Sequence, residues 1–284
     1  MNLFKTLRPL QWSKNLLVFV PLLAAHRWAD AAAWGAAALA ALAFCLAASA
    51  GYLLNDLYDA EADRLHPIKR LRPLAAGKLT PELVMVVWVV LVSAGFWCGF
   101  SISRTFPIFL AVYLCLSWAY SCILKLLAPL DLIALVGFYL IRLFAGHAAC
   151  GVKTSPWLTM FCLFLFSSLV LFKRFTELNV NDPATNGRGY KSVDAAALHS
   201  LGTTCGLLAV LVVALYTQSP DVQILYHHAA LLLLACPLLL YWQTRLWLMA
   251  GRHLLSDDPL TAIGTDKQTY ILTAIGAAIV WGAL

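Results

Sequence analysis

The sequence is poor in charge, which excludes a water-soluble globular protein. Only 12% of its 284 residues are Asp, Glu, Lys or Arg, and 62% are hydrophobic, whereas an ordinary soluble domain has roughly 25% charged residues. A soluble core of this size could not bury so much apolar surface, but a bilayer solvates it with about 20 apolar residues per crossing. The composition therefore predicts an integral membrane protein with several crossings.

The sequence also lacks paired cysteines, polar linkers and low-complexity segments. Its eight cysteines lie singly inside apolar stretches, which argues against a zinc site and against a disulfide framework. We interpret them as small buried apolar residues. Because no Gly/Ser-rich linker or soluble segment interrupts the pattern, we expect one transmembrane domain over residues 1–284.

Apolar runs separated by charges, prolines and turn residues predict nine transmembrane helices in an all-α fold. The first run is short and contains Pro21, and the cations before it resemble the start of a signal peptide. His26, Arg27 and Trp28 stand where such a peptide needs small residues for cleavage. The predicted helices cover residues 15–28, 31–54, 81–100, 105–122, 129–150, 155–172, 197–217, 224–244 and 268–284.

The distribution of lysine and arginine predicts the orientation in an inner (cytoplasmic) membrane. With a cytoplasmic N-terminus, the loops near residues 55–80, 121–128, 173–196 and 245–267 also face the cytoplasm. Sixteen of the 20 basic residues then lie inside and three lie outside, as the positive-inside rule requires. Topology thus explains the net charge of +6, and we expect bilayer lipids, not nucleic acid, as partners of these cations.

An acidic segment follows the second predicted helix. Asp56, Asp59 and Asp63 are spaced at i, i+3 and i+7, so they project from one face if the helix continues. Three such carboxylates repel one another and need a cation, and oxygen-only ligands suit Mg²⁺, which binds one or two carboxylates plus substrate phosphates. The alternative is a solvated helix end whose acids pair with neighbouring basic residues.

Basic residues come directly after these acids. Lys69, Arg70 and Arg72 lie between Pro67 and Pro73, and the prolines restrict the loop. Carboxylates for a metal ion beside cations for phosphate are the components of a metal-assisted diphosphate site. We therefore predict that the three aspartates bind Mg²⁺ and take part in catalysis, and that the three cations bind substrate.

The acidic segment resembles the first acidic motif of the UbiA superfamily of intramembrane prenyltransferases, Asn55-Asp56-x-x-Asp59-x-x-x-Asp63. The resemblance covers essentially the whole chain and implies a nine-helix bundle with a cytoplasmic-side active site. Further stretches resemble the polyprenyl-phosphate phosphoribosyltransferase branch, whose members transfer 5-phosphoribose from phosphoribosyl diphosphate to a lipid phosphate. These are Arg8-Pro9-x-Gln11-Trp12-x-Lys14-Asn15, the run from Asp59 to Pro73, Tyr139-Leu140-Ile141-Arg142-x-x-Ala145-Gly146 and Lys173-Arg174-Phe175-x-Glu177-Leu178.

The second cytoplasmic loop departs from the superfamily pattern. Ordinary prenyltransferases of the superfamily carry a second Asp-rich motif there, but here cations are prominent, and a second carboxylate-held metal is less secure. We assign Lys173 and Glu177 to catalysis, and Arg174, Arg188 and Lys191 to substrate binding, since arginine binds phosphate through two hydrogen bonds. The alternatives are headgroup anchoring for the cations and pairing with Lys173 for Glu177.

Single residues elsewhere complete the predicted site. Arg142 is the one basic residue inside a predicted span and Tyr139 lies one turn before it; such charges usually serve function, although snorkelling to the interface is the alternative. We assign both to substrate binding, together with Lys14 and Asn55. Asp131 is either an end cap or a partner of Lys125.

The expected reaction joins the donor's anomeric carbon to an oxygen of the lipid phosphate, which is ionised at neutral pH and needs no strong base. Positioning and charge neutralisation supply most of the barrier reduction. One alternative uses an allylic diphosphate to alkylate an aromatic or quinone precursor, and the diluted second motif argues against it. Another is a lipid or ion carrier, whose sites tend to lie near the midplane, unlike these acids. The sequence is compatible with a homo-oligomer as well as with a monomer.

Overall fold

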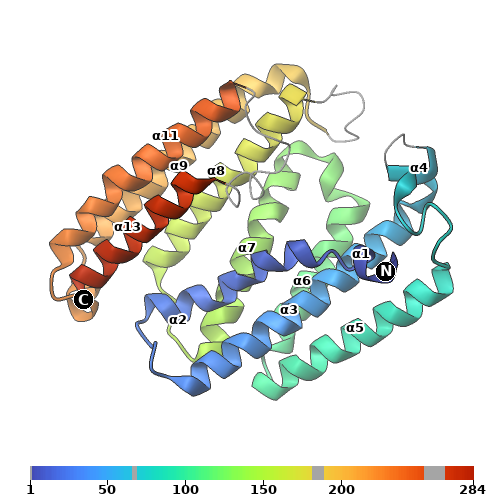
Figure 1. Ribbon diagram of the computed structural model, residues 1–284, viewed down its shortest axis with the longest axis horizontal. Helices are drawn as coiled ribbons and strands as arrows, with labels where there is room; N and C mark the ends of the chain where they lie inside the picture. The colour runs from blue at the N-terminus through green and yellow to red at the C-terminus, as the bar shows by residue number, and fades with distance from the viewer. Residues whose placement is uncertain (1, 66–68, 181–188, 253–265) are drawn as a thin grey trace. The chain divides into compact units, whose positions relative to one another are not determined.

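The computed structural model describes residues 2–65, 69–180, 189–252 and 266–284, which form helices joined by short loops, with no strand among them (Figure 1). Six helices in this part of the chain are long and apolar enough to cross a membrane, and a shorter apolar helix covers Pro107–Cys122. The predictions of an all-helical fold and of a multi-pass membrane protein are therefore confirmed. Nine crossings and a cytoplasmic active site stay predictions.

From residue 31 onward most helices follow the predicted apolar runs, with two differences. The predicted helix 224–244 is interrupted after residue 225 and its last part runs on to residue 251, and the helix predicted to end at residue 172 continues to residue 180, so Lys173, Arg174 and Glu177 are helical and not in a loop. The α-helices are α1 Asn2–Thr6, α2 Val20–Ala24, α3 Ala31–Tyr58, α4 Ala60–Leu65, α5 Pro81–Ile102, α6 Pro107–Cys122, α7 Ala128–Cys150, α8 Pro156–Val180, α9 Ala195–Tyr216, α10 Pro220–Leu225, α11 Ala235–Gly251 and α13 Lys267–Ala283. The 3₁₀ helices are η1 Pro9–Phe19, η2 Lys69–Leu71, η3 Leu124–Leu126, η5 Ser192–Asp194 and η6 Ala229–Leu234. Two compact units result: unit 1 comprises residues 1–125 and 137–154, and unit 2 comprises residues 126–136 and 155–284.

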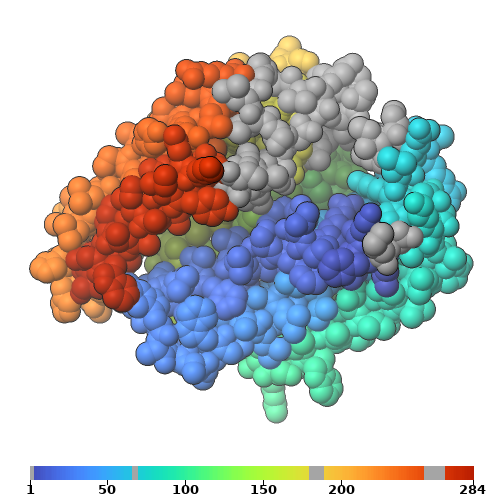
Figure 2. Space-filling view, in the orientation of Figure 1, coloured from blue at the N-terminus to red at the C-terminus, as the bar shows by residue number. Residues whose placement is uncertain are grey.

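The first predicted helix, residues 15–28, is not one continuous α-helix. The chain forms the 3₁₀ helix η1 and then the short α2, in which Pro21 stands near the first position. Proline has no N–H to donate and its ring crowds the carbonyl of residue i−4, so an α-helix that reaches it from the N-terminal side is kinked or broken. Within unit 1, η1 lies along α3, as the space-filling view shows (Figure 2).

In unit 1, α3 packs against η1, α5 and α6. Asp30 caps its start, because the carboxylate accepts a hydrogen bond from the N–H of Ala33 at 2.9 Å. The buried residues of α3 are mostly alanines, and small residues let membrane helices approach closely. Aromatic rings fill the space beside them: Phe44 meets Phe106 and Tyr113 edge to face.

One close approach in unit 1 requires a glycine. A Cβ atom at Gly146 of α7 would lie 2.3 Å from the carbonyl oxygen of Val18 in η1. The missing side chain lets the two backbones touch. This contact fixes η1 against α7, and it gives a physical reason for the glycine in the stretch from Tyr139 to Gly146.

In unit 2, α8 and α9 pair along their length and α11 packs against them. The core contains Phe172, Phe175 and Trp247, and a Cβ at Gly202 would lie 2.2 Å from the ring of Trp247. The hydroxyl of Ser168 donates a hydrogen bond to the carbonyl oxygen of Gly202 at 2.7 Å. Small residues and interhelical hydrogen bonds of this kind are typical of helix packing in membranes.

A half-buried ion pair of unit 2 joins α11 to α13. Asp266 caps α13 and accepts hydrogen bonds from both Nη atoms of Arg245 at 2.5 and 3.0 Å. Burial would raise the pKa of Asp266, but the hydrogen bonds from Arg245 and Thr269 outweigh it and lower the pKa to about 2. The carboxylate is therefore ionised at neutral pH.

Candidate functional site

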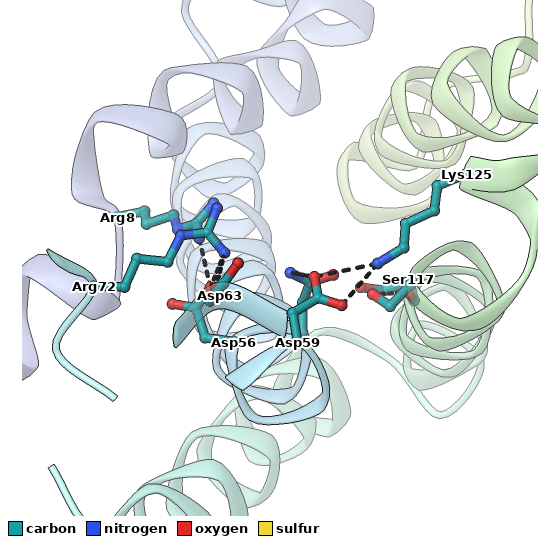
Figure 3. Close-up of polar contacts among 9 residues, drawn as sticks. Arg8, Asp56, Asp59, Asp63, Arg72, Ser117 and Lys125 are labelled. Atoms are coloured by element: carbon teal, nitrogen blue, oxygen red, sulfur yellow. Dashed lines mark hydrogen bonds and ion pairs between the residues drawn. The ribbon is translucent and has the colours of Figure 1, made fainter. Parts of the chain in front are cut away.

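Two buried aspartates at the junction of α3 and α4 share one arginine. Asp56 and Asp63 both accept hydrogen bonds from Nη1 of Arg72, at 3.3 and 2.6 Å. Arg8 adds a second guanidinium, whose Nη2 donates to Oδ1 of Asp56 at 2.6 Å (Figure 3). We call Arg8, Asp56, Asp63 and Arg72 the Arg72 cluster. Its two guanidinium groups balance its two carboxylates, as buried charges require.

The third aspartate of the motif points elsewhere. α3 ends at residue 58 and α4 begins at residue 60, so Asp59 occupies a turn. Its carboxylate accepts hydrogen bonds from Nζ of Lys125 at 2.9 and 3.2 Å and from Nδ2 of Asn55 at 3.1 Å. Figure 3 shows it turned away from the Arg72 cluster. The predicted shared face is thus wrong for Asp59, whose carboxylate is held by Lys125 and Asn55, and it holds for Asp56 and Asp63, which share Arg72.

Arg8 has a left-handed backbone, with φ 50° and ψ 58°. This conformation costs a residue with a Cβ atom roughly 1–2 kcal/mol, and such strain persists only where the surroundings hold it. Here the guanidinium binds Asp56 and stacks over the ring of Tyr52, with 4.8 Å between its Cζ and the ring centroid. These contacts hold Arg8 at the acidic motif.

Two cations that were not predicted at this site contact its aspartates. Arg8 binds Asp56 and Lys125 binds Asp59. Lys125 was weighed as a partner of Asp131, and this is wrong, since it binds Asp59. A signal was nevertheless present: both cations lie in segments that the positive-inside rule assigns to the same membrane side as the acids. The positive-inside rule does not say which of the basic residues on that side contact the aspartates.

The Arg72 cluster has the donor set that a magnesium ion needs. Among the described residues no three His, Cys, Asp or Glu side chains are arranged to hold a metal ion. Yet Nη1 of Arg72 is a cationic atom shared by carboxylate oxygens of Asp56 and Asp63. Mg²⁺ uses one or two protein carboxylates and completes its shell with water and substrate phosphate. The side chain of Arg72 is partly exposed, so if it were displaced, Asp56 and Asp63 would be the residues to hold Mg²⁺.

Arg142 belongs to a buried polar network of unit 1. Its Nε donates to Oδ1 of Asn15 at 2.6 Å, its Nη1 to the carbonyl oxygen of Phe138 at 2.6 Å and its Nη2 to the hydroxyl of Tyr113 at 3.0 Å. The side chain is buried, so it does not snorkel to an interface. This arrangement joins α7 to η1 and to α6. Its assignment to substrate binding stays a prediction.

A second carboxylate and guanidinium group lies in unit 2. Arg174 in α8 donates from Nε and Nη2 to the carboxylate of Asp131 at 2.5 and 2.8 Å, and from Nη1 to Glu177 at 2.6 Å. We call Asp131, Arg174 and Glu177 the Arg174 cluster. Asp131 is thus a partner of Arg174, and Glu177 contacts the cation three residues before it.

The remaining predicted site residues keep their assignments as predictions. The half-buried ones are Lys14 in η1, Tyr139 in α7 and Lys173 in α8, and the exposed ones are Arg70 in η2 and Lys191 before η5. Arg188 and the side chain of Lys69 lie outside the described residues.

Comparison with known proteins identifies relatives of the whole chain. The sequence pattern described as the UbiA prenyltransferase family matches residues 16–254. The decaprenyl-phosphate phosphoribosyltransferase of Mycolicibacterium smegmatis is 35% identical over 76% of this chain and 69% of its own length. The nodulation protein NoeC of Azorhizobium caulinodans is 32% identical over 93% of this chain and 87% of its own length. The uncharacterized protein y4nM of Sinorhizobium fredii is 34% identical over 96% of this chain, which spans only about half, 54%, of that relative.

Solved structures share the fold. A UbiA homolog from Archaeoglobus fulgidus bound to GPP and Mg²⁺ matches with a TM-score of 0.72 at 15% identity, over 100% of this chain and 99% of that one. A digeranylgeranylglyceryl phosphate synthase matches with a TM-score of 0.68 at 18% identity, again over 100% and 99%. At such identities the likeness concerns the fold alone.

Proposed function

The chain belongs to the UbiA prenyltransferase family, and on this premise we propose that it transfers 5-phosphoribose from phosphoribosyl diphosphate to a polyprenyl phosphate and releases diphosphate, with Mg²⁺ as cofactor. One observation carries the proposal: the buried carboxylates of Asp56 and Asp63 are held by partly exposed guanidinium groups. Relatives that are 34% to 37% identical and are named decaprenyl-phosphate phosphoribosyltransferase support the choice of substrates.

The donor diphosphate is bound by the cations of unit 1. Arg8 and Arg72 exchange their carboxylate partners for phosphate oxygens, which guanidinium groups bind through paired hydrogen bonds. Lys125 likewise leaves Asp59 and binds a phosphate oxygen through its single ammonium group. When bound by Asp56 and Asp63, Mg²⁺ supplies positive charge that makes diphosphate a better leaving group. In the absence of donor, ion pairs with the aspartates therefore hold Arg8, Arg72 and Lys125 at the place where the donor binds.

The acceptor needs charge neutralisation and positioning instead of a base. Its phosphate oxygen is already ionised and forms the new bond to the anomeric carbon as the bond to diphosphate breaks. Lys14, which lies in η1 six residues after Arg8, is proposed to bind the acceptor phosphate. The isoprenoid tail remains in the hydrocarbon layer, against the exposed apolar side chains of the helices. Because the acidic motif lies among basic loop residues, we propose that transfer takes place at the cytoplasmic side of the inner membrane.

A two-substrate assay tests this function directly. Purified full-length protein receives Mg²⁺, labelled phosphoribosyl diphosphate and polyprenyl phosphate, and in parallel a labelled prenyl diphosphate with an aromatic acid. We expect labelled lipid only in the first mixture, and none when Mg²⁺ is removed with a chelator. Label in the second mixture alone would contradict the proposed substrates, and label in neither would contradict transferase activity on both pairs.

A further inference from the structure

Two groups of carboxylates in this chain are each bridged by arginine, and they differ in how firmly the arginine is fixed. In the Arg72 cluster of unit 1, the side chains of Arg8 and Arg72 are 31% and 28% exposed. In the Arg174 cluster of unit 2, Arg174 is 1% and Asp131 0% exposed. A divalent cation can replace the guanidinium groups of Arg8 and Arg72, because these partly exposed side chains can turn toward solvent or a phosphate group. Arg174 is buried and cannot turn toward solvent in this way.

The geometry of Arg174 strengthens this difference. Its Nε and Nη2 form a bidentate pair with Asp131, and its third nitrogen, Nη1, binds Glu177. All three guanidinium nitrogens are therefore used, and the flat fork matches the carboxylate it faces. By contrast, Arg72 reaches both of its carboxylates with a single nitrogen.

The surroundings of Arg174 are equally fixed. It lies inside the long helix α8, between Phe172 and Phe175, both of which belong to the buried core of unit 2. Turning the guanidinium away would break three charge-assisted hydrogen bonds and leave the buried carboxylate of Asp131 without its cation, which buried ion pairs do not tolerate. The cation is thus part of the core of the unit.

We propose that Arg174 is a built-in counter-ion that takes the place of a second metal ion, so that Asp131 and Glu177 bind no divalent cation. The inference rests on the proposed function for its donor. It makes Arg174 a positioning residue of the core, and it limits the metal-binding carboxylates of the two clusters to those of unit 1. Donor binding then requires metal at one cluster only.

Locating bound Mn²⁺, which replaces Mg²⁺ and scatters anomalously, tests the inference. Crystals of the full chain are grown with Mn²⁺ and phosphoribosyl diphosphate but no lipid phosphate. In the wild type we expect an anomalous peak at Asp56 and Asp63 and none at Asp131 and Glu177. A peak at the Arg174 cluster of the wild type would overturn the inference.

Substitutions at Arg174 provide the second arm. Arg174→Ala removes the internal cation and should gain a Mn²⁺ peak between Asp131 and Glu177, whereas Arg174→Lys keeps a cation and should gain none. The matched control is Arg245→Ala, which removes an arginine from a pair with a single carboxylate of the same unit and should also gain none. Absence of the new peak in folded Arg174→Ala would contradict the inference.

A variant that keeps the arginine covers the case in which Arg174→Ala does not fold. Electron paramagnetic resonance counts the Mn²⁺ bound per chain with donor present, in the wild type and in Glu177→Gln. We expect equal counts, and the loss of one ion in Glu177→Gln would refute the inference. A wild type without Mn²⁺ at Asp56 and Asp63 would instead contradict the metal assignment of the proposed function, and the Arg174→Ala peak would still decide this inference.

Discussion

Arg142 donates a hydrogen bond from its Nε to the side-chain oxygen of Asn15 at 2.6 Å, and both side chains are buried. The other contacts of the guanidinium are the carbonyl oxygen of Phe138, the hydroxyl of Tyr113 and the aromatic faces of Phe44 and Tyr113. Among the described residues, no carboxylate forms an ion pair with it. Neutral oxygens and π faces therefore stabilise this intramembrane charge.

Replacing Asn15 with leucine should destabilise unit 1. Asn15→Leu keeps the volume approximately but removes the oxygen that accepts from a charged donor, a loss of about 1.5–3 kcal/mol. We expect a lower thermal midpoint in detergent, measured by intrinsic fluorescence. Ser13→Ala, an exposed change in the same 3₁₀ helix, serves as the control. Equal midpoints for both variants would show that the hydrogen bond does not support the fold.

The close approach at Gly146 gives a second prediction. In Gly146→Ala the new methyl group would lie 2.3 Å from the carbonyl oxygen of Val18, so η1 must move, at a cost of about 1–3 kcal/mol. Gly137→Ala in the same helix meets only the side chain of Leu116, at 3.4 Å. The first variant should lose thermal stability and the second should not. A midpoint for Gly146→Ala within the error of the wild type would contradict the packing described.

The sequence predicted most helices from α3 onward, because hydropathy reports directly which segments a bilayer can solvate. It misplaced the span 224–244, which the structure divides among α10, η6 and α11. It could not predict the break of the first helix into η1 and α2, because a proline at that place is also compatible with a kinked helix. The orientation of Asp59 and the partner of Asp131 were missed for another reason: Lys125 and Arg174, which bind these carboxylates, are distant from them in sequence. Residue types and spacing indicated the carboxylates and cations, but packing decided their pairing.

The ion pair of Asp266 with Arg245 should make stability depend on pH in the acid range. The pKa of Asp266 is lowered to about 2, below the ordinary value of about 3.9, so its stabilisation, on the order of 2 kcal/mol, is complete above about pH 4 and is lost as the pH falls toward 2. Asp266→Asn should therefore lower the thermal midpoint at neutral pH. The gap to the wild type should narrow below about pH 4; a gap that stays constant would refute this account.

Lys125 should contribute to donor binding through its charge. Lys125→Met keeps the length of the side chain but removes the ammonium group now on Asp59. Losing a hydrogen bond from a charged group should raise the KM for phosphoribosyl diphosphate about tenfold to hundredfold, with little effect on the KM for polyprenyl phosphate. Lys78→Met changes an exposed lysine and should leave both constants unchanged. A similar rise in both KM values for Lys125→Met would indicate a general structural defect.

The acidic motif itself gives the strongest prediction, because two of its acids, five residues apart, differ in environment. Asp56 is buried and bound by Arg8 and Arg72, whereas Glu61 is exposed. Asp56→Asn keeps the shape and an oxygen for Arg8 but removes the charge that binds Mg²⁺, so transfer should fall about a hundredfold or more while the protein stays folded in detergent. Glu61→Gln removes the same charge from the same segment and should keep full activity and the wild-type Mg²⁺ requirement. If both variants lost activity equally, the local negative charge, and not a metal ligand, would be what the reaction needs; if Asp56→Asn stayed fully active, this carboxylate would not bind the metal.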